Sequence, residues 1–178
     1  MKLLAGWMGA GALVLMTSLV GCSGKKDCSN GECACDEGGS CDFTCEAPPC
    51  HVDCAGDNPS CTGTCGNATC TCGEGSNCDF LCDSGPCHVD CQGGNDECSG
   101  TCANGTCYCA ATSHCDFDCL DDNCKFDCDG TCVVTCAPGT QGTTCQVNSC
   151  ASGTPELCAD GTHIACGESC PPPSSSGE

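Results

Sequence analysis

CGNATCTCGEGSNCDFLCDSGPCHVDCQGGNDECSGT, residues 65–101, is a 37-residue stretch with eight cysteines that recurs along the chain. Residues 28–64 reproduce every one of its cysteine spacings, and residues 102–136 form a third, altered copy. Self-similarity at a fixed period of this length is typical of a repeat architecture, in which each unit stacks on its neighbours.

Short cysteine pairs inside the copies follow a period of two residues. In each pair the two cysteines and a central Phe or Val share one face, while mostly Asp, His, Thr and Lys occupy the other. This alternation predicts short strands with one buried face, separated by turns rich in Gly, Pro, Asn and Asp. The predicted strands are 41–45, 50–54, 78–82, 87–91, 115–119 and 124–128. When the cysteine segments that begin at 61, 70, 98 and 107 are included, strand starts recur every 8, 9 or 11 residues, which leaves no room for helices.

The third copy and the C-terminal part depart from the repeat. Between Cys128 and Cys132 seven residues are missing if Asp129–Thr131 aligns with Thr62–Thr64. A degenerate last copy is typical of a capped array. Residues 137–170 then form a C-terminal cysteine cluster, and the Pro- and Ser-rich tail 171–178 is expected to be extended and mobile.

The composition indicates a disulfide scaffold and argues against a nucleic-acid partner. The chain has 31 cysteines in 178 residues, a formal net charge of −20 and no arginine. Binding to phosphates requires clustered Lys and Arg. Only fourteen large apolar residues follow residue 21, so without cross-links the chain is expected to be disordered.

The N-terminus indicates export. Lys2 precedes an apolar run, and the run ends in Leu19, Val20, Gly21 and Cys22. These four residues resemble the lipobox of bacterial lipoproteins. The resemblance implies a signal peptide at 1–21, lipidation of Cys22, for example with palmitate, and a lipidated tether at 22–27. The alternatives are a transmembrane helix, since 18 apolar residues approach the length that spans a bilayer, and a simple cleaved secretion signal.

The residue after the lipidated cysteine bears on the location. In that lipoprotein family an Asp there commonly retains the protein at the inner membrane. Ser23 therefore favours a lipid anchor in the bacterial outer membrane, with the protein on the periplasmic or the cell-surface side. Two or more acyl chains make a stable anchor.

Export makes disulfides the first interpretation of the cysteines, because thiols outside the cytosol are oxidised. Setting Cys22 aside leaves 30 cysteines, enough for 15 bridges. Two cysteines four residues apart on a strand lie roughly 13 Å apart, beyond the ~7 Å limit of a disulfide. Each therefore bridges to another segment, and the same holds for the C-x-C pairs at 33–35, 70–72 and 107–109. We expect a ladder of cross-links, with Phe43, Val52, Phe80, Val89, Phe117 and Phe126 filling the gaps.

The expected fold is small, disulfide-rich and all-β or irregular, built as a disulfide-stapled β-solenoid or a stack of small β units. Residues 28–35 and 102–109 resemble the C-x-N-G-x-C-x-C run of tenascin-type EGF modules, which implies three EGF-like modules in tandem as an alternative. An irregular knot of loops is the third possibility. The segments 61–65, 98–102 and the Thr69–Thr71 turn also resemble the Thr-Cys-Thr arrays of cysteine-rich antifreeze solenoids, although most strands here present Asp or His.

Candidate metal ligands fall into three groups. His51 with Asp53 and His88 with Asp90 occupy equivalent outward positions, either as ligands or as solvated residues copied with the repeat, and we favour the second reading. His114 and His163 are isolated in the sequence. Acidic turns supply the oxygen atoms that Ca²⁺ prefers, although weak, diffuse binding is expected at this charge. The calcium candidates are Asp57, Asp96, Glu97, Asp121 and Asp122.

The sequence lacks the motifs of the common enzyme classes. No C-x-x-C occurs, so the motif that thioredoxin-like chemistry and covalent haem attachment usually require is absent. Thiolate clusters resembling metallothionein remain an alternative to bridges. We expect a non-enzymatic, lipid-anchored envelope protein that has no cofactor and serves as a structural or binding surface. Its partner would be an envelope protein or a polysaccharide, which the sequence does not identify. The alternative is a protein that binds or sequesters Ca²⁺ or another cation.

Overall fold

The computed structural model describes residues 24–27, 31–44, 49–95, 97–119 and 123–172, and within them every regular element is a β-strand. The lipobox residues 19–22 lie outside these ranges. The strands are β1 (Gly24–Asp27), β2 (Glu32–Cys35), β3 (Ser40–Thr44), β4 (His51–Cys54), β5 (Ser60–Gly66), β6 (Thr69–Cys72), β7 (Cys78–Ser84), β8 (His88–Cys91), β9 (Cys98–Cys102), β10 (Thr106–Cys109), β11 (His114–Cys119), β12 (Cys124–Cys128), β13 (Thr131–Thr135), β14 (Cys145–Cys150), β15 (Glu156–Leu157) and β16 (His163–Cys166).

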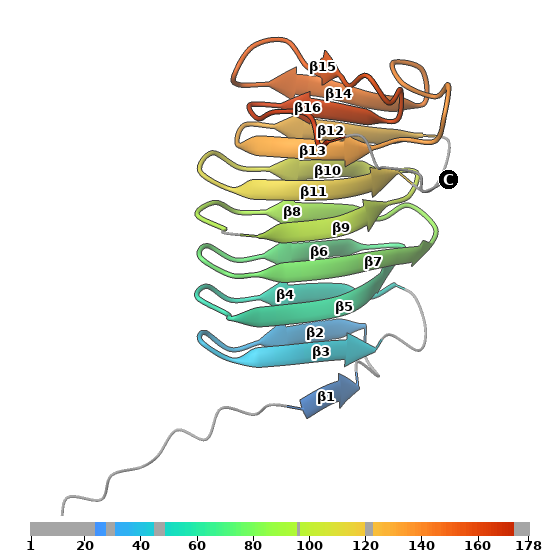
Figure 1. Ribbon diagram of the computed structural model, residues 1–178. Helices are drawn as coiled ribbons and strands as arrows, with labels where there is room; N and C mark the ends of the chain where they lie inside the picture. Colours follow the sequence, from blue (N-terminus) through green and yellow to red (C-terminus); the bar gives the residue numbers. More distant parts are fainter. Residues whose placement is uncertain (1–23, 28–30, 45–48, 96, 120–122, 173–178) are drawn as a thin grey trace, which may run out of the picture.

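The strands stack into a β-solenoid (Figure 1). Odd-numbered strands form most of one sheet, in the order β1-β3-β5-β7-β9-β11-β13-β16-β15, and even-numbered strands form a second sheet, β14-β12-β10-β8-β6-β4-β2. We call these the odd sheet and the even sheet. One even strand and the odd strand that follows it make one coil, and successive coils pair in parallel.

Two coils make one sequence repeat. Strand register pairs Cys41 with Cys61, twenty residues on, and Cys61 with Cys78, seventeen residues on. The same two steps then recur from Cys78 to Cys98 and from Cys98 to Cys115. The 37-residue period is therefore the sum of a long and a short coil.

The core explains why two different coils alternate. On the inner side of the odd sheet, register places Phe43, Gly63, Phe80, Gly100 and Phe117 in one line. The three Phe side chains are at most 2% exposed. A Cβ atom at Gly63 would lie 3.2 Å from the Phe43 Cβ, and one at Gly100 would lie 2.9 Å from the Phe80 carbonyl oxygen. Each ring fills the space that a neighbouring glycine leaves empty.

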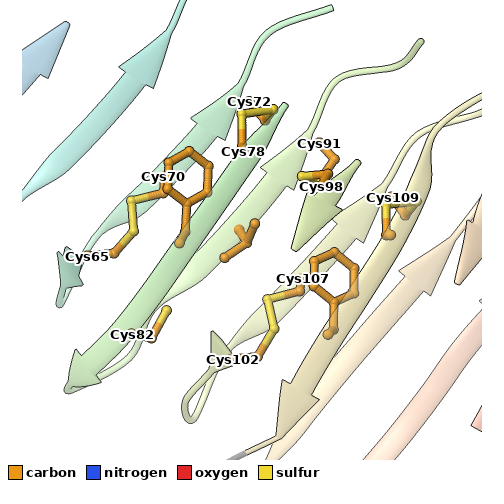
Figure 2. Packing of buried hydrophobic residues seen from close by; sticks show 14 of the residues in the cluster. Cys65, Cys70, Cys72, Cys78, Cys82, Cys91, Cys98, Cys102, Cys107 and Cys109 are labelled. Atoms are coloured by element: carbon orange, nitrogen blue, oxygen red, sulfur yellow. A yellow bond between two sulfur atoms is a disulfide. The ribbon is translucent and has the colours of Figure 1, made fainter. Parts of the chain in front are cut away.

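Most disulfides close the turn between two consecutive strands, and all of them join different segments, as the distance argument predicts; Cys150–Cys166 and Cys158–Cys170 instead link more distant segments of the C-terminal part. Figure 2 shows Cys65–Cys70, Cys72–Cys78 and Cys102–Cys107. No bridge joins two cysteines of one strand among the described residues, and every described cysteine is bonded. The other bridges with both partners described are Cys35–Cys41, Cys54–Cys61, Cys82–Cys87, Cys91–Cys98, Cys109–Cys115, Cys119–Cys124, Cys128–Cys132, Cys136–Cys145, Cys150–Cys166 and Cys158–Cys170.

The predicted strands are all present, and two details differ from the sequence interpretation. Thr69–Thr71 is part of strand β6 and not a turn, because every C-x-C segment forms an inner-facing pair of the even sheet. Register aligns Cys132 with Cys115 and Cys98. The turn Cys128–Cys132 spans four positions where Cys91–Cys98 spans seven, so the third copy lacks three residues there, not seven.

The C-terminal part ends the solenoid with a reversal of direction. Strand β14 still pairs in parallel with β12, with an irregularity in register between Phe126 and Asp127. Strand β16 then pairs antiparallel with β13 and with β15. We call β14, β15 and β16 the cap. Cys150–Cys166 joins its two sides.

Candidate functional site

The outer face of the even sheet carries the His-x-Asp pairs that the sequence singles out. His51 and Asp53 lie on β4 and His88 and Asp90 on β8, with β6 paired between them. His51, Asp53 and His88 are exposed, and Asp90 is partly exposed. Since neighbouring strands are about 4.8 Å apart, the two pairs are separated by about 10 Å. The structure therefore does not bring them together around one ion.

These pairs belong to a regular row on alternate coils. Lys125 and Asp127 of β12 take the same positions in the third copy, and hydroxyl residues such as Thr69 and Thr71 occupy the coils between. His88 Nδ1 lies 3.1 Å from both the backbone N–H and the backbone carbonyl oxygen of Thr106. These contacts hold the imidazole ring against the neighbouring strand β10.

The outer face of the odd sheet carries a second regular row, in which carboxylates alternate with hydroxyls. Register places Asp42, Thr62, Asp79, Ser99 and Asp116 side by side on successive coils. The Thr62 hydroxyl donates to Asp42 Oδ1 over 3.2 Å, and the Ser99 hydroxyl donates to Asp79 Oδ1 over 3.1 Å. The carboxylates thus recur about every 10 Å on a flat sheet face, held in place by their hydroxyl neighbours.

The calcium candidates do not meet at one site within the described residues. Asp57 is exposed, has a left-handed backbone with φ 59°, and lines a hollow of about 610 Å³ together with Glu37 and Glu74. Glu97 lines a different hollow, of about 240 Å³, beside Asp79. The remaining candidates, at positions 96, 121 and 122, lie outside the described ranges.

A buried polar ladder inside the turns was missed from the sequence. Asn58, Ser76, Asn95 and Ser113 are at most 3% exposed and lie on successive coils. The Asn95 side-chain amide donates to the Gly73 carbonyl (2.7 Å) and the Ser76 carbonyl (3.0 Å). The Ser113 hydroxyl donates to Asn95 Oδ1 over 3.0 Å. The available signal was the 37-residue spacing of Asn58 from Asn95 and of Ser76 from Ser113.

The two histidines that look isolated in the sequence have acidic partners near the cap. His114 Nδ1 on β11 lies 3.6 Å from Glu168 Oε2 and 2.9 Å from the Thr131 hydroxyl. His163 Nδ1 lies 2.6 Å from Asp160 Oδ2. Folding of the cap onto β13 brings Glu168 to His114, a contact that the sequence does not show because the two residues are 54 positions apart.

Local environment changes the acidity of these carboxyl groups. Burial raises the pKa of Glu168, and nearby Asp116 raises it further while His114 opposes the change. Burial, followed by the charge of Asp118, likewise raises the pKa of Asp116. The backbone N–H groups of Thr162 and His163 hold the pKa of Asp160 well below its usual range.

Cysteine sulfurs also approach one another closely in two places. Cys65, Cys82 and Cys87 form one group and Cys109, Cys115 and Cys132 form another, with the sulfurs of each group within 4.8 Å. All six are bridged. A sulfur in a disulfide is not a thiolate, and the thiolate is the form that binds metal ions, so these groups are stacked disulfides.

Comparison with protein-family models, curated proteins and solved structures gives no match. Across the part of the chain that the structure describes, we find no helix with the length and apolar character needed to cross a membrane.

Proposed function

We propose that this chain is a non-enzymatic, lipid-anchored rod of the bacterial cell envelope, whose flat faces serve as a binding surface. The supporting observation is the regular row on the odd sheet, where Asp42, Asp79 and Asp116 recur on alternate coils with hydroxyls between them. A rigid row of this kind presents the same polar groups at a fixed spacing to an extended partner.

The anchor in this proposal rests on the sequence. Cleavage before Cys22 and lipidation of its sulfur would attach the rod through the tether that precedes β2. Ser23 favours the outer membrane. The partner in this proposal is an envelope component, either a protein or a polysaccharide. A net charge of −20 argues against nucleic acid.

Rigidity without a large apolar core supports the scaffold role. Each turn bridge closes a short loop; for example, Cys72–Cys78 spans six positions. Closing such a loop in the unfolded chain stabilises the fold by about 2 kcal/mol in the chain-entropy model. Many such bridges in series hold a narrow solenoid whose interior has room for little more than one ring per pair of coils.

Two matched experiments test the proposal. Metabolic labelling with palmitate should mark the wild type and Ser23→Ala, whereas Cys22→Ser should incorporate none. Binding of the full chain to isolated envelopes should fall in the double variant Asp42→Asn with Asp79→Asn. The control Asp57→Asn with Glu74→Gln removes the same charge from a turn and should retain binding. Labelling of Cys22→Ser, or equal loss in both double variants, would refute the proposal.

Cation binding is the second candidate function, because Glu37, Asp57 and Glu74 surround one hollow on the turn side of the solenoid. If these carboxylates act only through long-range attraction, calcium affinity should drop steeply between low and physiological salt. Stoichiometric binding at physiological salt that is lost in Asp57→Asn would favour this candidate over the scaffold.

A further inference from the structure

The first described strand lies where the proposed lipid anchor joins the solenoid. Strand β1 pairs in parallel with β3 over four residue pairs, from Gly24 with Cys41 to Asp27 with Thr44. It is the outermost strand of the odd sheet at the N-terminal end, whereas β15 and β16 lie at the opposite end (Figure 1). Most of the tether expected at 22–27 is therefore a hydrogen-bonded part of the stack.

Chain length limits how far Cys22 can lie from this strand. Only Ser23 separates Cys22 from Gly24. Consecutive Cα atoms are about 3.8 Å apart, so the Cα atoms of Cys22 and Gly24 lie within about 8 Å of each other. A lipid attached to Cys22 is consequently confined to the N-terminal end of the solenoid.

The strand register places the anchor beside a column of acidic turns. Gly24 pairs with Cys41, which ends the first of these turns. The turns on three successive coils carry Glu37, Asp57 and Glu74, all exposed and all lining the hollow of about 610 Å³. If the solenoid lay down on this side, the carboxylates would have to lose water of hydration and approach lipid phosphates, and both changes cost free energy.

The N-terminal end differs in charge from the rest of the solenoid. Strand β1 contains Lys25, Lys26 and Asp27, and it is the one strand of the sixteen described whose sequence has a net positive charge. Its lysines are two of the three that follow residue 21. Lysines close to an anionic lipid surface are attracted to it. This end is therefore the part of an otherwise acidic chain that best tolerates contact with lipid head groups.

We propose that the N-terminal end of the solenoid is a membrane-contact surface, on which the solenoid stands with its stacking axis directed away from the lipid bilayer. The proposal rests on the lipidation of Cys22 proposed above. The odd sheet has nine strands, and at about 4.8 Å between neighbours the cap would lie about 40 Å from the bilayer. Both outer faces then remain accessible to a partner.

Neutron reflectometry of the lipidated chain in a supported bilayer of phosphatidylcholine and phosphatidylglycerol tests this orientation. We expect a protein layer about 40 Å thick that begins at the head groups at both low and physiological salt. A solenoid lying on its side would give a layer of only about 20–30 Å, because the strands are short and the two sheets are close together.

A matched pair of insertions tests the role of the short connection. Eight Gly and Ser residues inserted between Ser23 and Gly24 should release the end from the bilayer. The acidic solenoid should then leave a protein-free gap beside the head groups at low salt, and the gap should narrow at physiological salt because the repulsion is screened. The same insertion between Ser175 and Ser176 is the control and should reproduce the wild-type profile.

Two results would overturn the proposal: a wild-type layer of about 20–30 Å, or a wild-type profile that shifts with salt as the profile of the Ser23–Gly24 insertion does. Failure of lipidation is recognised separately, because palmitate labelling would then be absent. In that case residues 22–178, which include every described residue, are coupled through Cys22 to a maleimide lipid in the same bilayer. The thickness and salt dependence of the layer then decide in the same way.

Discussion

At the scale of single residues, the shape of the neighbouring coils determines which side-chain sizes fit at each core position. Phe80 lies between Gly63 and Gly100 in the register of the odd sheet. A ring fits there because the two glycines contribute no side-chain volume, and the close-packed interior leaves no room to spare. The third copy departs from this rule, since Val134 follows Phe117 in the same line and the Phe117 ring stacks on that of Phe126, with centroids 5.7 Å apart.

Gly100→Val is predicted to loosen the central coils. A Cβ there would lie 2.9 Å from the Phe80 carbonyl oxygen and 3.3 Å from Val89 Cγ2, so the backbone of β9 must move. Overpacking of this kind costs about 1–3 kcal/mol, which corresponds to a roughly five- to 160-fold faster hydrogen exchange of β7 and β9 amides. Ser99→Ala, on the outer face of the same strand, is the control and should change exchange little. Unchanged protection in Gly100→Val would contradict this packing account.

At the scale of elements, period-two alternation was sufficient to predict the strands at 41–45, 78–82 and 115–119. Alternation around a central Phe or Val reports one buried face, which is the property that defines a strand here. The C-x-C strands were harder to predict from the sequence. Thr69–Cys72, for example, contains no large apolar residue, and its inward-facing cysteines are buried only because the opposite sheet covers them.

The contact between His114 and Glu168 near the cap could not be predicted from the sequence. This contact depends on strand β16, which runs antiparallel to β13. No local sequence pattern predicts that an antiparallel strand follows a stack of parallel ones. The His-x-Asp rows, in contrast, followed from the repeat, because equivalent positions in a solenoid necessarily align.

Opening the Cys150–Cys166 bridge is predicted to release the cap and leave the rest of the solenoid closed. Each element of a solenoid contacts only its neighbours, so loss of an end is not transmitted far. In the double variant Cys150→Ala with Cys166→Ala, amides of β15 and β16 should exchange much faster, while those of β5 and β7 keep their protection. The matched variant Cys91→Ala with Cys98→Ala should instead affect the central coils. Uniform loss of protection along the chain in the cap variant would show a single cooperative unit.

At the scale of the whole molecule, the free energy gained by burying apolar groups is small compared with the conformational entropy lost when the chain is ordered. The fully buried core consists mostly of cysteines with a few Phe and Val side chains, and a narrow solenoid exposes much of every turn to water. Burial of so few apolar groups does not offset the conformational entropy of ordering the chain. Stability must therefore come chiefly from the cross-links, which restrict the unfolded ensemble.

Full reduction is accordingly predicted to unfold the protein under otherwise native conditions. After treatment with a phosphine reductant, the β-sheet signal in far-UV circular dichroism should disappear and the radius of gyration should rise at least about two-fold. The oxidised protein, incubated with an alkylating agent but no reductant, serves as the control and should stay compact and resist proteases. Because each bridge closes a loop of only a few residues, partial reduction should release coils one after another and produce intermediates of increasing size. A reduced chain that remains compact and retains its sheet signal would mean that the Phe–Gly packing and the backbone hydrogen bonds suffice without the disulfides.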